Sequence, residues 1–144
     1  MKSPSVPPPP WQESIRVDRR LAERMHTRFE VDLFEGMLAI DRNHLGALHG
    51  LGCAYTRSGD HSKALAADLR FSTLCPENPV AHYNLACSLA NLRRIEEALE
   101  ALERAVRLGY RDFRHIDHDP DLANVRRDPR YHKMLLRLRK SRSG

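Results

Sequence analysis

The chain has 144 residues, of which 41% are hydrophobic and 30% are charged, a balance typical of a globular protein with one domain. No window approaches the ~18 apolar residues that a membrane-spanning helix needs, and the first ten residues lack the apolar run of a signal peptide. We therefore expect a cytoplasmic protein.

The N-terminal end divides into a tail and a helical segment. Residues 1–10 are rich in Ser and Pro and are expected to be a disordered tail. Helical spacing begins at Trp11, and its apolar residues are Ile15, Leu21, Met25 and Phe29. A second helix is expected at about residues 30–40, with an apolar stripe of Val31, Phe34, Met37 and Leu38. The two helices would form a first, degenerate repeat over residues 11–44.

Residues 45–78 and 79–112 are two copies of one 34-residue unit. Most of the residues that the copies share are small or apolar. The shared pairs are Ala47/Ala81, Leu51/Leu85, Cys53/Cys87, Ala64/Ala98, Leu65/Leu99, Ala67/Ala101, Arg70/Arg104 and Leu74/Leu108. A period of 34 residues is typical of helix-turn-helix repeats that stack into a solenoid.

Each of these two units is expected to contain two helices. The expected helices span residues 45–56, 61–74, 79–92 and 95–108. Gly59 and Gly109 are placed to end helices, because glycine readily adopts the left-handed conformation found there. No segment alternates polar and apolar residues, so no β-sheet is expected.

Residues 113–140 are expected to cap the last repeat, because the terminal unit of a solenoid needs a polar outer face. Two Asp-Pro pairs in this segment each indicate the start of a short helix. They are Asp119-Pro120 and Asp128-Pro129. The second helix should run over about residues 129–139, with an apolar stripe of Tyr131, Met134, Leu135 and Leu138.

The C-terminal end carries the positive charge of the chain, whose net value is +5. Residues 126–144, which include a basic tail at 141–144, hold eight Lys or Arg against Asp128 alone. Such a block would attract nucleic acid or anionic lipid. The alternative is a solvated helix face with cations near the C-terminal end of its helix. We favour this alternative, because no aromatic residues interleave with the charges as a stacking platform requires.

The two clear units resemble the tetratricopeptide repeat, in which large and small residues recur at fixed offsets over 34 residues. The matching residues of the first copy are Leu48, Leu51, Gly52, Tyr55, Gly59, Ala64 and Pro76, and those of the second are His82, Leu85, Ala86, Leu89, Ala98, Leu102 and Ala105. The resemblance implies an all-α fold: a right-handed α-solenoid of three repeats over residues 11–112, followed by C-terminal capping helices. Residues 116–131 look like the stretch that ends many bacterial arrays of this family, so a bacterial source is expected.

In this family the first helices of successive repeats line a concave groove. The resemblance therefore implies a non-catalytic protein-interaction module that binds a peptide segment in that groove. The groove residues that it implies are Arg19, His49, Cys53, Arg57, Tyr83, Asn84, Cys87 and Asn91. Arg19 and Arg57 would be available to an acidic peptide. Of the residues with which some members clamp a C-terminal carboxylate, only Asn84 is matched, so that mode of binding is not expected.

The second helix of the middle unit departs from the family pattern. Asp68 stands where a bulky residue is usual, and Phe71 stands three residues later where a small one is usual. We infer an exchange of volume in which Phe71 fills the space. Burying Asp68 without a partner would be costly, so it should be exposed or paired.

The sequence gives no sign of an active site. It contains no Gly-rich phosphate loop, nucleophile elbow or metalloprotease helix, and no enzyme activity is expected. Residues 115–119 hold two His and two Asp, but Asp119 serves as an N-cap, so neither a metal nor a cofactor is expected. Cys53, Cys75 and Cys87 are expected to be reduced thiols.

Several functions therefore stay open. A protein-interaction adaptor ranks first, a nucleic-acid or anionic-surface binder acting through the basic tail second, and a small chaperone third. Self-association through the exposed ends of a three-repeat array is a further possibility. Nothing in the sequence identifies the partner.

Overall fold

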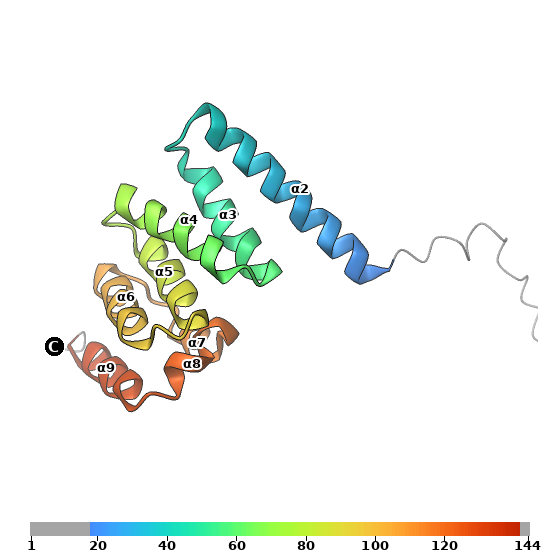
Figure 1. The fold of residues 1–144 in the computed structure, drawn as a ribbon. Helices are drawn as coiled ribbons and strands as arrows, with labels where there is room; N and C mark the ends of the chain where they lie inside the picture. Colours follow the sequence, from blue (N-terminus) through green and yellow to red (C-terminus); the bar gives the residue numbers. More distant parts are fainter. Residues whose placement is uncertain (1–17, 142–144) are drawn as a thin grey trace, which may run out of the picture.

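The computed structural model describes residues 18–141, and within this range every regular element is a helix (Figure 1). The elements are α2 (Arg19–Ile40), α3 (Leu45–Ser58), α4 (His61–Leu74), α5 (Pro79–Asn91), α6 (Ile95–Leu108), α7 (Phe113–His118), the 3₁₀ helix η1 (Pro120–Leu122), α8 (Ala123–Arg126) and α9 (Pro129–Lys140). The expected tail at 1–10, the beginning of the first expected helix and residues 142–144 lie outside the described residues. The all-α solenoid is confirmed.

The hairpins α3–α4 and α5–α6 are the two 34-residue units, and their helix bounds agree with the expected ones to within two residues. Gly59 follows α3 with φ 81°, and Gly109 follows α6 with φ 120°. Both values lie in the region that L side chains rarely adopt. The helix stops expected at these glycines are confirmed.

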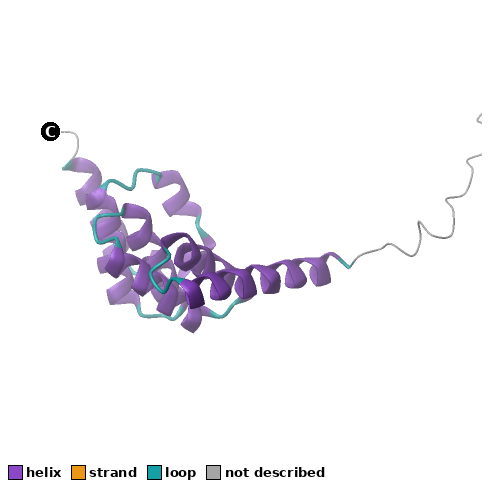
Figure 2. Cartoon of the chain, turned by 90° about the horizontal axis from the view of Figure 1, so that it is seen from above, coloured by secondary structure: helices purple, strands orange, loops and turns teal. Residues whose placement is uncertain are grey.

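The expected helix boundary near residue 30 is wrong. Residues 19–40 form one continuous helix, α2, because they contain no proline and no turn sequence at which a helix would stop. Only its C-terminal half packs closely: Val31, Phe34 and Leu38 contact a small core cluster contributed by α3 and α4. No residue of α2 is fully buried, and its N-terminal half reaches beyond the packed helices (Figures 1 and 2).

The main hydrophobic core lies at the other end of the chain, where α5 and α6 pack with α7, η1, α8 and α9. Its largest fully buried side chains are Tyr131, Leu102, Ile116, Leu122, Val106 and Val125. The expected stripe of α9 is buried here, and Asp128 caps that helix by accepting a hydrogen bond from the backbone N–H of Arg130 at 2.9 Å. The capping role expected for the C-terminal segment agrees with this packing.

The volume exchange in α4 also agrees with the structure. Phe71 is buried against Leu48 and Ala81, where two successive hairpins meet. Asp68 is only 2% exposed, and its carboxylate accepts a hydrogen bond of 2.6 Å from the Ser88 hydroxyl of α5. The aspartate is therefore buried and paired, one of the two outcomes expected.

Candidate functional site

The first helices of the two clear repeats place most of the expected groove residues on facing surfaces. His49, Cys53 and Arg57 lie four residues apart along α3, so they share one face of that helix. Asn84 of α5 reaches this face, with its amide nitrogen 3.2 Å from Nδ1 of His49. This contact joins neighbouring repeats, so Asn84 also has a structural role.

A pocket of about 300 Å³ lies between these two helices. The residues around it are Gly52, Cys53, Thr56, Arg57, Asp68, Tyr83, Asn84, Cys87, His115, Asp119 and Asp121. Arg57 makes an ion pair with Glu30 of α2 at one end of the pocket. The remaining ionisable groups are three carboxylates, one His, one Tyr and two Cys side chains, so the pocket is more acidic than basic.

The chain's own C-terminal segment covers the other part of the groove. Tyr83 donates a hydrogen bond of 2.6 Å to Oδ2 of Asp119, and the amide of Asn91 donates one of 3.1 Å to Oδ1 of Asp121. The amide of Asn124 donates to the backbone carbonyl of Ala90 at 3.0 Å. These contacts tie η1 and α8 to the groove face of α5.

This packing corrects the expectation that all the groove residues face an open surface. Tyr83 is only 4% exposed, because its ring stacks on Tyr110 with the centroids 4.2 Å apart. Cys87 is buried beside Asp119, and Asn91 already holds Asp121. On α5, Asn84 is the expected groove residue that still borders the pocket with part of its side chain exposed.

The structure does not place Arg19 in the groove. It lies in the first turn of α2, its side chain is 93% exposed, and it pairs with Glu23 of the same helix. The continuous helix is the reason, since the expected turn near residue 30 would have folded this segment back beside α3. A wide hollow of about 1020 Å³ lies between this half of α2 and the α3–α4 turn, and Arg57 is the expected groove residue that it includes.

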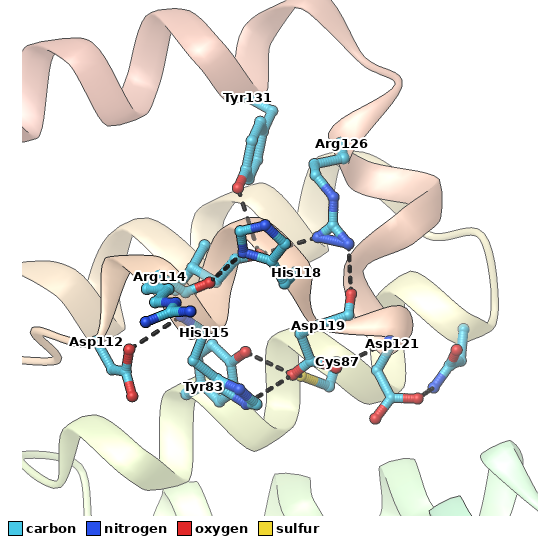
Figure 3. A network of polar contacts seen from close by, with 12 residues as sticks. Tyr83, Cys87, Asp112, Arg114, His115, His118, Asp119, Asp121, Arg126 and Tyr131 are labelled. Atoms are coloured by element: carbon cyan, nitrogen blue, oxygen red, sulfur yellow. Dashed lines mark hydrogen bonds and ion pairs between the residues drawn. The ribbon is translucent and has the colours of Figure 1, made fainter.

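Asp119 is the centre of the polar network that fixes the C-terminal segment (Figure 3). Besides the Tyr83 hydroxyl, its Oδ2 lies 3.1 Å from Nε2 of His115, and its Oδ1 accepts from the backbone N–H of Asp121 at 2.9 Å. Its backbone carbonyl accepts from the Arg126 guanidinium at 2.5 Å. One aspartate thus serves as an N-cap and as the link between α5 and α7.

A comparison with known families agrees with this architecture. The family model described as "Tetratricopeptide repeat" matches residues 79–112, which are α5, α6 and the turns at their ends. Residues 79–112 therefore form a repeat of the tetratricopeptide type.

Two relatives extend the similarity beyond one repeat. The chain is 33% identical over 90 residues to a protein of Arabidopsis thaliana described as chloroplastic, an alignment covering 58% of this chain and 26% of the relative. It is 43% identical over 54 residues to a "TPR repeat-containing protein" of Picosynechococcus sp., covering 38% of this chain and 14% of the relative. The chain thus spans a small part of each relative's length. Among the described helices of this chain, none is long and apolar enough to cross a membrane.

Burial controls the protonation of the groups around the pocket. Desolvation raises the pKa of Asp68 to about 6, although the Ser88 hydroxyl partly offsets this effect. Desolvation, and then the nearby Cys87, raise the pKa of Tyr83 far above its ordinary value. Desolvation and the carboxylates of Asp119 and Asp121 do the same to the pKa of Cys87. Tyr83 and Cys87 therefore stay protonated at neutral pH and act as hydrogen-bond donors rather than nucleophiles.

The described residues bring one set of metal-binding side chains together. Ligand atoms of Cys87, Asp119 and Asp121 lie within 4.8 Å of one another. The thiol is held protonated, and Asp119 already accepts from Tyr83 and Asp121, so binding a metal would require these contacts to be given up. The nearby His118 is turned away, because its Nδ1 lies 2.8 Å from the carbonyl of Arg114.

The sequence indicated only in part that the C-terminal segment would pack into the groove. The Asp119-Pro120 pair correctly marked a helix start. Nothing local indicated that the same carboxylate would reach Tyr83, which lies 36 residues earlier. A cluster of polar residues immediately after the last repeat is the sequence feature that could have indicated a contact with the groove.

Proposed function

We propose that this protein is a non-catalytic protein-interaction module that holds a segment of its partner against the open part of its groove. The contact residues would be His49, Cys53 and Arg57 of α3 together with Asn84 of α5. The observation that carries the proposal is the pocket of about 300 Å³ lined by Cys53, Arg57 and Asn84, beside a stretch of groove that already holds a polypeptide segment.

The bound segment is the chain's own residues 119–124. The Tyr83 hydroxyl and the Asn91 amide of α5 each donate to one of its aspartates, and its own Asn124 amide donates to a backbone carbonyl of α5. The same kind of recognition would suit a partner segment laid along α3, because His49 and Asn84 offer comparable polar groups. Few anchors of this type imply modest affinity.

The charge around the pocket suggests which segments would be accepted. Asp68, Asp119 and Asp121 border it, and Arg57 is already paired with Glu30. We therefore propose that the partner segment offers a Lys or Arg side chain, or backbone N–H groups, rather than the acidic side chains first expected for this groove.

Binding through the basic C-terminal end is the competing proposal. Part of that charge is engaged within the protein: Arg137 pairs with Glu103 at 2.9 Å, and Arg139 pairs with Asp117 at 3.0 Å. Such exposed pairs are weak and would yield to a strong polyanion. The competing proposal therefore needs its own arm in the experiment.

The test is affinity capture from a nuclease-treated lysate of the source cells with three forms of the full chain. Cys53→Trp would fill the pocket mouth with an indole, because Cys53 is exposed at its edge. Arg104→Trp is the matched control, since it places the same side chain at an exposed position on α6. We expect one protein to be retained by the wild type and the control and to be lost with Cys53→Trp.

Two results would contradict the proposal. One is capture that Cys53→Trp leaves unchanged. The other is capture that disappears with nuclease, or with a chain in which the exposed Lys133 and Lys140 are both changed to Gln. This second result, with a steep decrease of binding as salt concentration rises, would favour the basic tail instead.

A further inference from the structure

The outer face of α2 carries an apolar stripe with nothing packed on it among the described residues. Val31, Phe34 and Leu38 mark the face that packs on α3 and α4. At 100° per residue, the opposite face holds Ala22, Met25, Phe29, Leu33, Gly36 and Ile40. Met25 is 65% exposed, Phe29 66% and Ile40 92%. Large exposed apolar side chains in one row are typical of an interaction surface.

The charges along α2 are divided between its two halves. Arg19, Arg20, Arg24 and Arg28 lie in the N-terminal half, where Glu23 is the one acidic residue within the helix. Glu30, Asp32 and Glu35 lie in the C-terminal half, which holds no Lys or Arg. Glu30 pairs with Arg57 and Glu35 accepts from the Tyr55 hydroxyl, both of α3, so Asp32 is the acidic residue of this half that borders the outer face. A second copy of α2 running in the opposite direction would place its basic half against the acidic half of the first. Parallel pairing would instead place like charges together.

The stripe is also symmetric about its central residue. Met25 and Leu33 lie four residues on either side of Phe29, and Ala22 and Gly36 lie seven residues on either side. Antiparallel pairing about a two-fold axis at Phe29 would therefore set Met25 against Leu33 of the second copy. It would also set Ala22 against Gly36, two small residues that allow the helices to approach closely. No other element needs to move to expose this face.

We propose that two copies of this chain associate through the outer faces of their α2 helices, packed antiparallel with the two Phe29 side chains at the two-fold axis. On one flank of the pair, Arg28 of each copy lies close to Asp32 of the other. None of the stripe residues borders the pocket beside Asn84, so the dimer keeps both grooves available. The second copy thus supplies the packing neighbour that the outer face of α2 lacks among the described residues.

The decisive experiment exploits the two-fold symmetry, using analytical ultracentrifugation of the full chain over a range of concentrations. Arg28→Glu sets a carboxylate against Asp32 of an identical copy, and Asp32→Lys sets an ammonium group against Arg28. Each variant alone should weaken dimerisation about tenfold, because two attractive pairs become repulsive. An equimolar mixture of the two variants should recover the wild-type dissociation constant to within about threefold, since the mixed dimer restores opposite charges on facing side chains.

The mixture separates the proposal from an effect inside one helix. Arg28 and Asp32 are also four residues apart in the same helix, and a contact of that kind would be disturbed equally in both variants and would not be restored by mixing. Recovery in the mixture therefore requires that the two residues meet between chains running in opposite directions. Weakening without recovery would overturn the antiparallel arrangement.

A substitution of the apolar stripe provides the second test. Phe29→Ser should abolish dimerisation while leaving the circular dichroism spectrum unchanged, because the side chain is exposed in the single chain. Leu69→Ser is the matched control, since Leu69 is also exposed, at 53%, but lies on α4, and it should dimerise as the wild type does. A wild-type chain that stays monomeric at every concentration, for example because another segment of the chain covers the stripe, would overturn the proposal.

Discussion

The two ends of this short array are closed in different ways. At the C-terminal end, α9 lays Tyr131, Met134 and Leu138 into the core and turns Arg137 outward to Glu103. At the N-terminal end, α2 buries no residue fully and turns Phe29 to the solvent. A solenoid needs a polar outer face wherever no further repeat follows. Among residues 18–141, the C-terminal end meets this need within one chain, and the N-terminal end does not.

This difference predicts where the protein's stability is concentrated, and Tyr131 should show the largest effect. The side chain has no exposed surface, and its hydroxyl donates to Asp117 at 2.9 Å. We expect Tyr131→Ala to lower the free energy of unfolding by roughly 3 to 5 kcal/mol, because it leaves a large cavity and removes this hydrogen bond. Urea denaturation followed by circular dichroism would measure the loss.

Leu136 of the same helix supplies the control for Tyr131. It faces outward and is 58% exposed. Leu136→Ala should change stability by no more than about 0.5 kcal/mol. Equal losses in the two variants would mean that α9 is not packed on α6 in solution, and the contrast between the ends would disappear.

A somewhat smaller effect is expected in the middle of the array, at Phe71. It is 7% exposed and packs on Leu48 and Ala81, so it links the two hairpins. Phe71→Ala should cost about 3 kcal/mol in the same urea experiment, the lower end of the usual range for a buried phenylalanine. A loss well below about 1 kcal/mol would show that α4 is rotated so that Phe71 does not fill this space.

The sequence predicted the C-terminal two-thirds of the fold well and the N-terminal end poorly, and the reasons are physical. In α3 to α6, strong local signals agreed with the 34-residue period, above all the glycines at 59 and 109. In α2, helical spacing continues through residue 30, and the family period suggested a turn where no residue breaks the helix. Periodicity identifies a helix face but not the partner of that face.

The candidate site was predicted in part for a similar reason. The family resemblance placed His49, Cys53 and Arg57 in the groove, and their spacing along α3 puts them on one face of that helix. Whether that surface is open to a partner depends on which other segments of the chain pack against it. Tyr83 is closed off by Asp119, a residue whose local role as an N-cap gave no indication of a second contact across the groove.

Asp68, which lies between the two hairpins, should make the free energy of unfolding depend on pH. Its Oδ1 has no hydrogen-bond partner among the described residues, and it lies so close to Gly52 that a Cβ there would collide with it. Burial raises the folded-state pKa to about 6, above the unfolded value, so the folded state binds the proton more tightly. The stability that this proton contributes is therefore present below about pH 4 and is lost as the pH rises through about 6.

The matching experiment compares wild type with Asp68→Asn from about pH 4 to 7. The asparagine does not ionise, and its carbonyl can still accept from Ser88, so the wild type should lose roughly 2 to 3 kcal/mol relative to the variant over this range. The control is Glu100→Gln, at an exposed position on α6. Its free energy of unfolding should change with pH as that of the wild type does. If the free energy of unfolding changed with pH equally in the wild type and in Asp68→Asn, Asp68 would be solvated rather than buried.

The smallest effect is expected at the N-terminal end, where Phe29 would test the contrast most directly. Tyr131→Ala should cost several kcal/mol, whereas Phe29→Ala should change the free energy of unfolding by less than about 0.5 kcal/mol. The reason is that an exposed side chain leaves no cavity when it is shortened. The measurement must be made at a concentration where ultracentrifugation shows single chains, since association would add the energy of the contact between copies. At high concentration the wild type should become more stable than Phe29→Ala. A large loss in the dilute sample would instead mean that Phe29 is covered within one chain, and that the N-terminal end is closed much as the C-terminal end is.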